Sequence, residues 1–228
     1  MQQGQSKKSI KFPVTMMQTP NNAVTPIEHL AASDPAMAAL INRIGPVDLH
    51  PRRLPPFQSI IHAIIHQQLS GTVAKAIYSR FIALFDDGDF PKPEEIIDID
   101  FELMKTAGLS KPKATYIKEV AKMAVIGIVP SLKECDRLAD NEIKERLLKI
   151  KGVGPWTVEM LLIFNLGRPD ILPIHDLGVR KGFQIAYRKR RLPALEQLDR
   201  FGKKWAPYRT YATLYLWAAA DFIKLNEW

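Results

Sequence analysis

The chain has 228 residues, a hydrophobic fraction of 46% and a formal net charge of +8. Its length suffices for one large domain or for two small lobes that share a core. The basic charge favours a polyanionic partner, although charge alone does not separate nucleic acid from an acidic membrane. No apolar run reaches the roughly 18 residues needed to span a bilayer. The single cysteine, Cys135, excludes internal disulfides and any four-cysteine metal site.

The N-terminal segment, residues 1–25, is polar and punctuated by proline and lysine, which predicts a flexible tail. It lacks the continuous apolar core of a secretory signal, so we expect an intracellular location. From Thr25 the pattern turns helical, and Ser33-Asp34-Pro35 indicates the start of a further helix. Aspartate caps a first helical turn, and proline suits the first helical position.

Two apolar helices are predicted next, over residues 57–68 and 73–85. The polar residues Gln67-Gln68-Leu69-Ser70 lie between them. Such a tip is unusual for a simple turn, where Asn, Asp or Gly would be expected. His62 and His66 are four residues apart, but no third ligand has suitable spacing, so we interpret them as core or groove histidines.

A hairpin is predicted over residues 147–164. Gly152-Val153-Gly154-Pro155 forms a tight turn between two apolar runs, and we expect a Cβ at either glycine to obstruct it. Lys149 and Lys151 lie beside this turn. The N–H groups of such a turn and the positive end of the following helix make an anion site. This pattern is typical of a helix-hairpin-helix, which grips a DNA phosphate. The two glycines alone are equally consistent with an ordinary helical hairpin. No long segment alternates like a strand, so we predict an all-α fold.

The residues after the hairpin read Ile171-Leu172-Pro173-Ile174-His175-Asp176-Leu177-Gly178-Val179-Arg180. Together with the hairpin, this stretch resembles the helix-hairpin-helix (HhH-GPD) DNA glycosylases, in which a loop after the hairpin ends in a catalytic aspartate. The DLGVR that begins at Asp176 is similar to the 3-methyladenine (alkylpurine) DNA glycosylase II branch. The WxPYRxxA pattern from Trp205 and the later Trp217 extend the resemblance, which covers roughly residues 36–217.

The resemblance implies an all-α architecture of two helical lobes with the active site in the cleft between them. After the tail, residues 26–228 would form the glycosylase domain. Residues 58–165 would make the central lobe, including the hairpin, and residues 26–57 plus 166–228 would make the second lobe. It also implies a monomer that acts on double-stranded DNA containing alkylated bases, and no membrane partner.

The implied chemistry is hydrolysis of the N-glycosidic bond of an alkylated purine, the first step of base excision repair, after the base is flipped out. Asp176 would be the catalytic carboxylate, stabilising positive charge on the sugar. Trp156, Met160 and Trp217 would line the base pocket. Relatives that also cleave the strand carry a lysine where this chain has Trp156, which implies a monofunctional enzyme without lyase activity.

The DNA contacts follow by resemblance as well. Gln68 or Leu69 would fill the gap left by the flipped base, with Ser70 touching a neighbouring base edge. The remaining expected contacts are Lys111, Lys113, Lys151, Gly152, Val153, Gly154 and Thr157. No cofactor is required, but relatives bind Na⁺ or K⁺ at the hairpin through main-chain oxygens, here those of Leu148, Ile150 and Val153. His175 precedes Asp176 where many relatives carry an acid, and we expect it to pair with Asp176 or to contact the DNA backbone.

Three alternatives remain open. A DNA-binding hairpin domain without enzyme activity would show salt-sensitive binding to undamaged DNA and nothing more. A homologue that binds damaged or abasic DNA without excising a base would show tight binding and no release. A bifunctional glycosylase for oxidised bases would form a covalent DNA adduct on borohydride trapping. The host compartment is the cytoplasm or nucleoid for a bacterium and the nucleus for a eukaryote.

Overall fold

The computed structural model describes residues 24–69, 71–85 and 89–224, with side chains as far as Asp221. Nearly all of the predicted tail and Ser70 therefore lie outside the described residues. The described part is helical and contains no strand, which confirms the all-α prediction. In chain order the helices are α1 (Pro26–Ser33), α2 (Pro35–Ile44), α3 (Pro56–His66), α4 (Gly71–Ile82), α5 (Pro93–Asp98), α6 (Phe101–Thr106), α7 (Lys111–Val125), α8 (Leu132–Cys135), α9 (Asp140–Leu147), α10 (Pro155–Met160), the π-helix η1 (Leu161–Asn165), α11 (Leu177–Ala186), α12 (Leu195–Gly202), the 3₁₀-helix η2 (Lys203–Trp205) and α13 (Arg209–Lys224).

Local sequence signals explain where several helices begin. Thr25 and Glu28 form a reciprocal capping box at α1. The Asp34 carboxylate accepts from the first backbone N–H groups of α2, with Pro35 at the first helical position, as predicted. In the second helix of the hairpin, the apolar run from Trp156 widens into a π-turn, in which the Leu166 N–H bonds the Leu161 carbonyl. Such turns occur frequently at functional sites.

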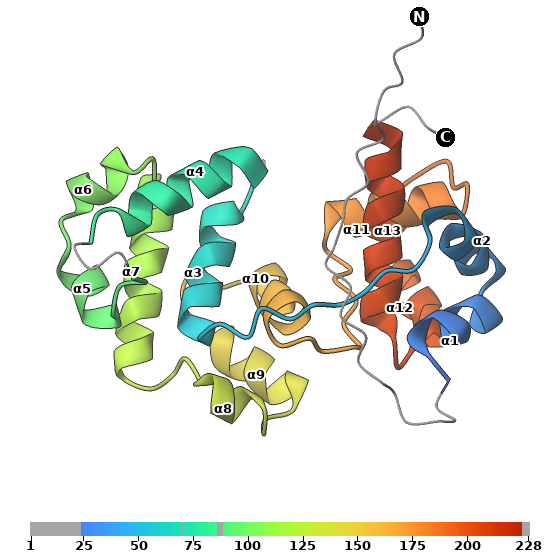
Figure 1. Ribbon diagram of the computed structural model, residues 1–228, viewed down its shortest axis with the longest axis horizontal. Helices are drawn as coiled ribbons and strands as arrows, with labels where there is room; N and C mark the ends of the chain where they lie inside the picture. The colour runs from blue at the N-terminus through green and yellow to red at the C-terminus, as the bar shows by residue number, and fades with distance from the viewer. Residues whose placement is uncertain (1–23, 70, 86–88, 225–228) are drawn as a thin grey trace, which may run out of the picture.

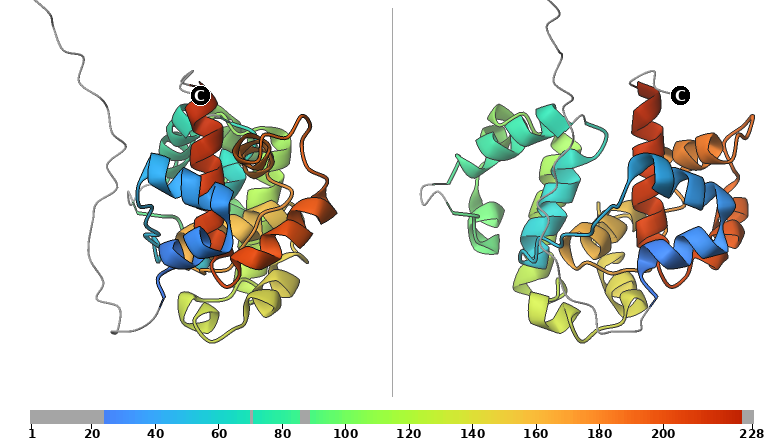
Figure 2. Two further views of the ribbon diagram at one scale, coloured as in Figure 1. Left: turned by 90° about the vertical axis from the view of Figure 1, so that its right-hand side faces the viewer. Right: turned by 45° about the vertical axis from the view of Figure 1, so that its right-hand side comes forward.

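Two hydrophobic cores define two lobes, which Figures 1 and 2 show on either side of the molecule. The first core takes buried residues from Ile60 to Ile171. The second combines Leu30, Met37 and Leu40 from the N-terminal helices with residues from Leu172 to Ala219. The central lobe is thus one continuous stretch, while the second lobe is built from the two ends of the chain. The C-terminal part of the second core begins at Leu172 rather than at the expected residue 166, because Leu166 and Ile171 both pack into the first core.

A buried carboxylate ties the two ends of the chain together in the second lobe. Asp34 is 1% exposed and accepts hydrogen bonds from Tyr187 and from Trp205 Nε1 at 2.9 Å. Lys204 Nζ lies 3.0 Å from it. Burial opposes the charge, but the bonds from Tyr187, Trp205 and Lys204 hold the pKa of Asp34 below its usual value.

Two segments, residues 45–55 and 166–176, cross between the lobes (Figure 1). The first is pinned to the end of η1, where the Asn165 side chain bonds both the N–H and the carbonyl of Leu54 at 3.0 and 2.8 Å. The second is pinned to the start of α13. There Arg209 pairs with Asp170 at 2.7 and 2.9 Å, and Thr210 Oγ1 accepts from the Ile171 N–H at 2.9 Å. The segment that leads to Asp176 is therefore fixed to the start of α13.

Candidate active site

Asp176 lies where the second crossing segment ends and α11 begins. It is the N-cap residue of α11, and its Oδ1 accepts the Val179 N–H at 2.8 Å. The carboxylate is thus held at the positive end of a helix, where a negative charge is stabilised. The DLG sequence accounts for this placement, since aspartate is a preferred N-cap residue.

Two tryptophans from different elements orient the same carboxylate. Trp217 Nε1, on α13, donates to Oδ1 at 2.8 Å, and Trp156 Nε1, on α10, donates to Oδ2 at 2.8 Å. The sequence pointed to both rings as pocket walls but gave no signal that their N–H groups bind Asp176. Three donors from three elements leave the carboxylate, which is only partly buried, with little freedom to rotate.

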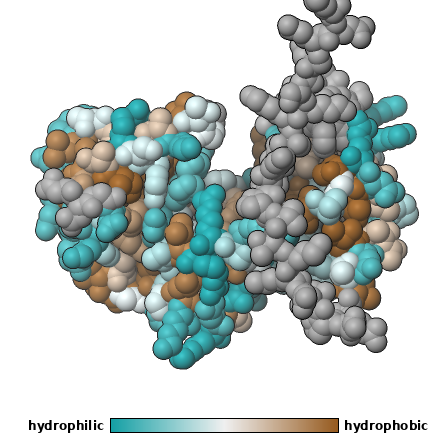
Figure 3. Space-filling view, viewed as in Figure 1, coloured by the Kyte–Doolittle hydropathy of each residue, from teal (hydrophilic) through white to brown (hydrophobic). Residues whose placement is uncertain are grey.

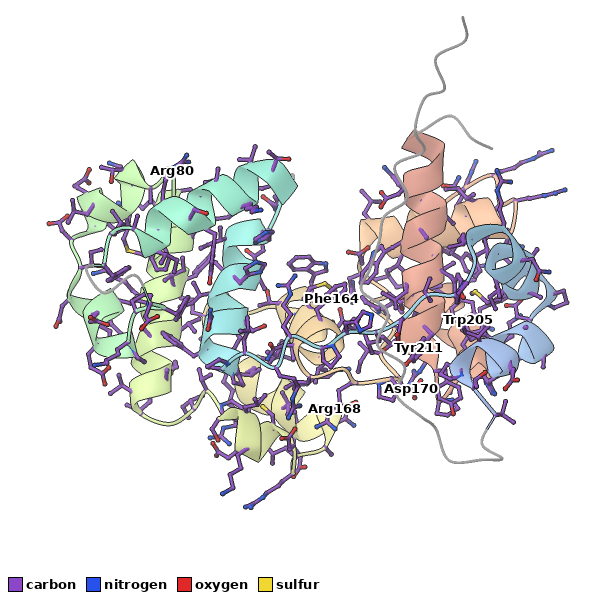
Figure 4. The ribbon with its side chains drawn as sticks, viewed as in Figure 1. Arg80, Phe164, Arg168, Asp170, Trp205 and Tyr211 are labelled. Carbon is purple, nitrogen blue, oxygen red and sulfur yellow. The ribbon has the colours of Figure 1, made fainter. Side chains whose placement is uncertain are left out.

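The aromatic wall beside Asp176 consists of Trp217 and Phe164. Their rings stack with centroids 5.5 Å apart, and Figure 4 shows Phe164 between the two lobes. Gly178 makes room for this wall, because an added Cβ would lie 2.9 Å from Trp217 Cδ1 and 3.0 Å from Asp176 Oδ1. Met160 is half-buried at the end of α10 and packs against the core of the central lobe.

The hairpin turn joins α9 to α10, and its two glycines differ in backbone conformation and in the space available to a side chain. Gly152 has a φ of +91°, and an added Cβ would lie 2.1 Å from Tyr116 Cγ. Gly154 has an ordinary φ of −97° and faces open space, with no heavy atom within 4 Å of an added Cβ. The expectation that a side chain would obstruct the turn at both glycines is therefore wrong for Gly154. Lys151 is exposed beside the turn.

The tip between α3 and α4 projects Gln68 and Leu69, both exposed, and Gln68 has a left-handed φ of +59°. Lys113 supports the tip from α7, because its Nζ donates to the carbonyls of Ile65 and Gln67, each at 2.8 Å. Two of its three donors are thereby occupied in capping α3. A phosphate contact by Lys113 stays a prediction, as does one by the exposed Lys111.

Of the expected DNA contacts, Thr157 is available only through its main chain, and that contact stays a prediction. Thr157 is 1% exposed, and its hydroxyl accepts from Gln67 Nε2 at 2.9 Å. Its side chain is therefore shut away from solvent and cannot reach a DNA strand. It serves instead to fasten the α3 end of the tip to α10. The sequence missed this role because nothing in a local pattern indicates which polar groups meet across two helices.

Glu159 is a second carboxyl group near the site that the sequence did not single out. It is 8% exposed, and its Oε2 has no hydrogen-bond partner. It lines a cavity of about 290 Å³ beneath the crossing segment, together with Lys144, Asp170 and His175. Burial raises the pKa of Glu159 to about 7; Lys144 opposes the shift and the charge of Asp176 adds to it. His175 is exposed on the wall of this cavity, and no hydrogen bond joins it to Asp176 among the described residues.

Other features of the described residues bear on function. No helix among them is long and apolar enough to cross a membrane. No cluster of three or more His, Cys, Asp or Glu side chains in this part of the chain could hold a metal ion. His62 and His66 stack at 3.9 Å on α3, and burial lowers the pKa of His62 to about 4, with further lowering by His66 and Arg52.

Residues 61–207 match the family model described as "HhH-GPD superfamily base excision DNA repair protein". The chain belongs to this superfamily. Among curated HhH-GPD relatives, it is 38% identical to the DNA-3-methyladenine glycosylase 1 of Schizosaccharomyces pombe, over 86% of this chain and 88% of that protein. It is 34% identical to the putative DNA-3-methyladenine glycosylase YfjP of Bacillus subtilis, over 72% of this chain and 59% of that one.

Solved HhH-GPD structures agree with this assignment. The S. pombe enzyme Mag1, solved in complex with abasic DNA, matches with a TM-score of 0.80 and 37% identity, over 89% of this chain and 98% of that chain. The DNA-3-methyladenine glycosidase of Bacillus halodurans matches with a TM-score of 0.76 and 36% identity, over 88% of this chain and 91% of that chain. The expected family and fold are thereby confirmed.

Proposed function

We propose that the protein is a monofunctional DNA-3-methyladenine glycosylase that hydrolyses the N-glycosidic bond of alkylated purines in duplex DNA. The observation that carries the proposal is the Asp176 carboxylate, fixed by the N–H groups of Trp156, Trp217 and Val179 beside an aromatic wall. The names of the relatives at 34–38% identity support the same reaction.

The role of Asp176 is electrostatic. Alkylation at N3 or N7 gives a purine a positive charge and makes it a good leaving group, so the base needs little activation. As the bond to C1′ breaks, positive charge develops on the sugar. A preorganised carboxylate stabilises that charge without reorganising at the moment of reaction. The remaining lone pair of Oδ2, which accepts only from Trp156, can orient the attacking water.

The flipped base would lie against the ring of Trp217, which Phe164 supports from behind. A cationic purine gains from stacking on such a ring, by about 0.5–2 kcal/mol. The exposed Gln68 and Leu69 at the tip would enter the duplex and fill the space that the base leaves. Met160 offers the base less stacking surface than an aromatic residue would. We therefore expect the preferred lesion to differ from that of relatives with an aromatic residue at this position.

Strand cleavage is not part of the proposed reaction. It requires an amine that forms a Schiff base with the sugar. At the position of that lysine in bifunctional relatives, this chain has Trp156, whose N–H is bonded to Asp176. Lys151 lies on the hairpin turn, where its charge suits a phosphate better than a sugar carbon.

The proposed partner is double-stranded DNA, bound by a monomer inside the cell. Gly154 supports DNA binding, because its open position lets a phosphate approach the backbone N–H groups at the start of α10. We further propose that the carbonyls of Leu148, Ile150 and Val153 hold a monovalent cation. The Ile150 carbonyl already accepts the Val153 N–H at 3.0 Å, which folds the turn and leaves its second lone pair for an ion. Replacing K⁺ by tetramethylammonium at constant ionic strength should then weaken DNA binding.

The deciding experiment measures free base released from methylated duplex DNA by the wild type and by Asp176→Asn. Release that disappears in the variant supports the proposal. If neither protein releases base but both bind an abasic duplex tightly, the protein is a damage-binding homologue without activity. Equal release from both would overturn the role of Asp176. Trapping with borohydride, expected to give no adduct, tests the absence of lyase activity.

A further inference from the structure

A groove of about 780 Å³ begins at Asp176 and follows α11 to its end. Its walls are α11 and the C-terminal turns of α13, which carry Trp217 and Asp221. Figure 1 shows α11 on the side of the second lobe that faces the central lobe, and Figure 3 shows the surface hollowed between the two lobes. The hairpin and the aromatic wall account for only the Asp176 end of this groove. The rest of it has no part in the function proposed above.

The groove combines an apolar floor with a basic rim. Leu177, 52% exposed, Ile185 and Trp217 supply apolar surface. Lys181 and Arg188 line the rim, and Lys189 follows at its end. Within the described part of the chain, no ion pair or side-chain hydrogen bond engages these three cations. By contrast, Arg180, on another face of α11, donates to the Pro193 carbonyl. Asp176 and Asp221 are the acidic groups of the groove.

The charge and the floor of the groove fit one strand of DNA. Lys181 lies on α11, and Arg188 lies just beyond Ala186, the last residue of that helix, so two cations line the groove at different points along its length. An apolar floor suits the faces of deoxyribose, while phosphates would meet the cations at the rim.

Arg188 occupies a backbone position that glycine would fill without strain. Its φ is +49°, and the chain reverses there, with the Arg188 and Lys189 N–H groups bonded to the Ile185 and Gln184 carbonyls. Helices commonly end with glycine in this left-handed conformation. An arginine here carries a strain cost of about 1 kcal/mol, and it places a guanidinium at the mouth of the groove.

We propose that this groove binds the sugar–phosphate backbone of the damaged strand beside the flipped nucleotide, with Lys181 and Arg188 contacting its phosphates. The proposal rests on the proposed function. Trp156, at the start of the second hairpin helix, touches one oxygen of Asp176, and the groove leads away from the other side. The hairpin and the groove would therefore hold the strand on opposite sides of the reacting sugar.

The test uses the full chain and duplexes that contain a tetrahydrofuran abasic analogue. The groove variant is Lys181→Gln with Arg188→Gly, which removes two charges and relieves the strained backbone. The matched control is Arg190→Gln with Arg191→Gln, which removes two charges from exposed neighbours that do not line the groove. Affinity is measured by fluorescence anisotropy over a range of salt concentrations, and folding by thermal unfolding.

The groove variant should lower the slope of log affinity against log salt by about 2 and weaken binding about 10- to 100-fold at 0.1 M salt. The control should keep the wild-type slope. A duplex cut short on the groove side should bind the wild type as weakly as the groove variant binds the long duplex. Equal losses of affinity in both variants, or an unchanged slope in the groove variant, would overturn the proposed role of the groove. Base release by the wild type would then still support the proposed function. A wild type that neither binds the abasic duplex nor releases base would overturn the proposed function as well.

Discussion

Trp217 donates its indole N–H to Oδ1 of Asp176 at 2.8 Å, and the same ring stacks on Phe164. One side chain therefore orients the Asp176 carboxylate and forms the wall against which the base would lie in the proposed reaction. The two tasks can be separated, because phenylalanine keeps an aromatic face and removes the donor.

Trp217→Phe and Trp156→Phe should each slow single-turnover base release about 10- to 100-fold. The reason is the loss of a hydrogen bond to a charged group, worth about 1.5–3 kcal/mol. Affinity for an abasic duplex, which presents no base to the wall, should change little. Release at the wild-type rate by both variants would show that the indole donors do not orient Asp176.

Gly178→Ala should damage catalysis more than folding. The added methyl would press on Trp217 and on Asp176 Oδ1, and displacing a reacting group by about 1 Å can cost 100-fold in rate. Urea unfolding should change by less than about 1 kcal/mol, because alanine is the better helix former. Gly182→Ala is the contrasting variant. Its Cβ would lie 1.8 Å from the Leu216 carbonyl oxygen, so α11 and α13 must separate and the fold should be lost first.

The hairpin glycines should respond in opposite ways. Gly152→Ala combines a left-handed φ with a collision against Tyr116, so the free energy of unfolding should fall by about 2–4 kcal/mol. Gly154→Ala meets nothing in the protein, and its stability should stay within about 0.5 kcal/mol of the wild type. Its affinity for an abasic duplex should nevertheless fall at least about tenfold, because the methyl projects where a phosphate approaches the turn. Wild-type affinity would exclude this turn as a phosphate site.

Glu159 should make stability depend on pH. Its pKa is raised to about 7 in the folded protein from an ordinary value near 4.5, so the folded state holds a proton that the unfolded state loses. This stabilisation is complete below about pH 4.5 and disappears as the pH rises through 7, a difference of roughly 3 kcal/mol. Glu159→Gln keeps a neutral side chain of similar shape. Its unfolding free energy should exceed that of the wild type at pH 8 and match it near pH 5; equal pH profiles would contradict the assignment.

Sequence patterns predicted the parts of this site that depend on local chemistry. Asp34 and Asp176 both cap helices by accepting hydrogen bonds from N–H groups two or three residues further along the chain. Such a signal can be read from four consecutive residues. The aromatic wall of Trp217 followed from family resemblance.

Contacts between distant elements could not be predicted in the same way. The two indole bonds to Asp176 and the Lys113 cap on α3 each depend on how helices far apart in the chain are packed. Thr157 illustrates the same limit, because a contact between distant elements buries a side chain that the local sequence suggests is available. A threonine next to a turn that is expected to bind phosphate looks available, and only the packing of α3 against α10 buries its side chain.

The second lobe is assembled from both ends of the chain, and this sets the order in which the protein can fold during synthesis. Met37 and Leu40 leave the ribosome early, but the helices that bury them, with Phe183 and Leu216, are translated last. The central lobe is continuous in sequence and can collapse while the remainder is still being made. Until residues 177–224 emerge, α1 and α2 lack the helices that bury them, and Asp34 lacks its partners Tyr187 and Trp205. A nascent chain can thus display a finished hairpin well before Asp176 is held in place.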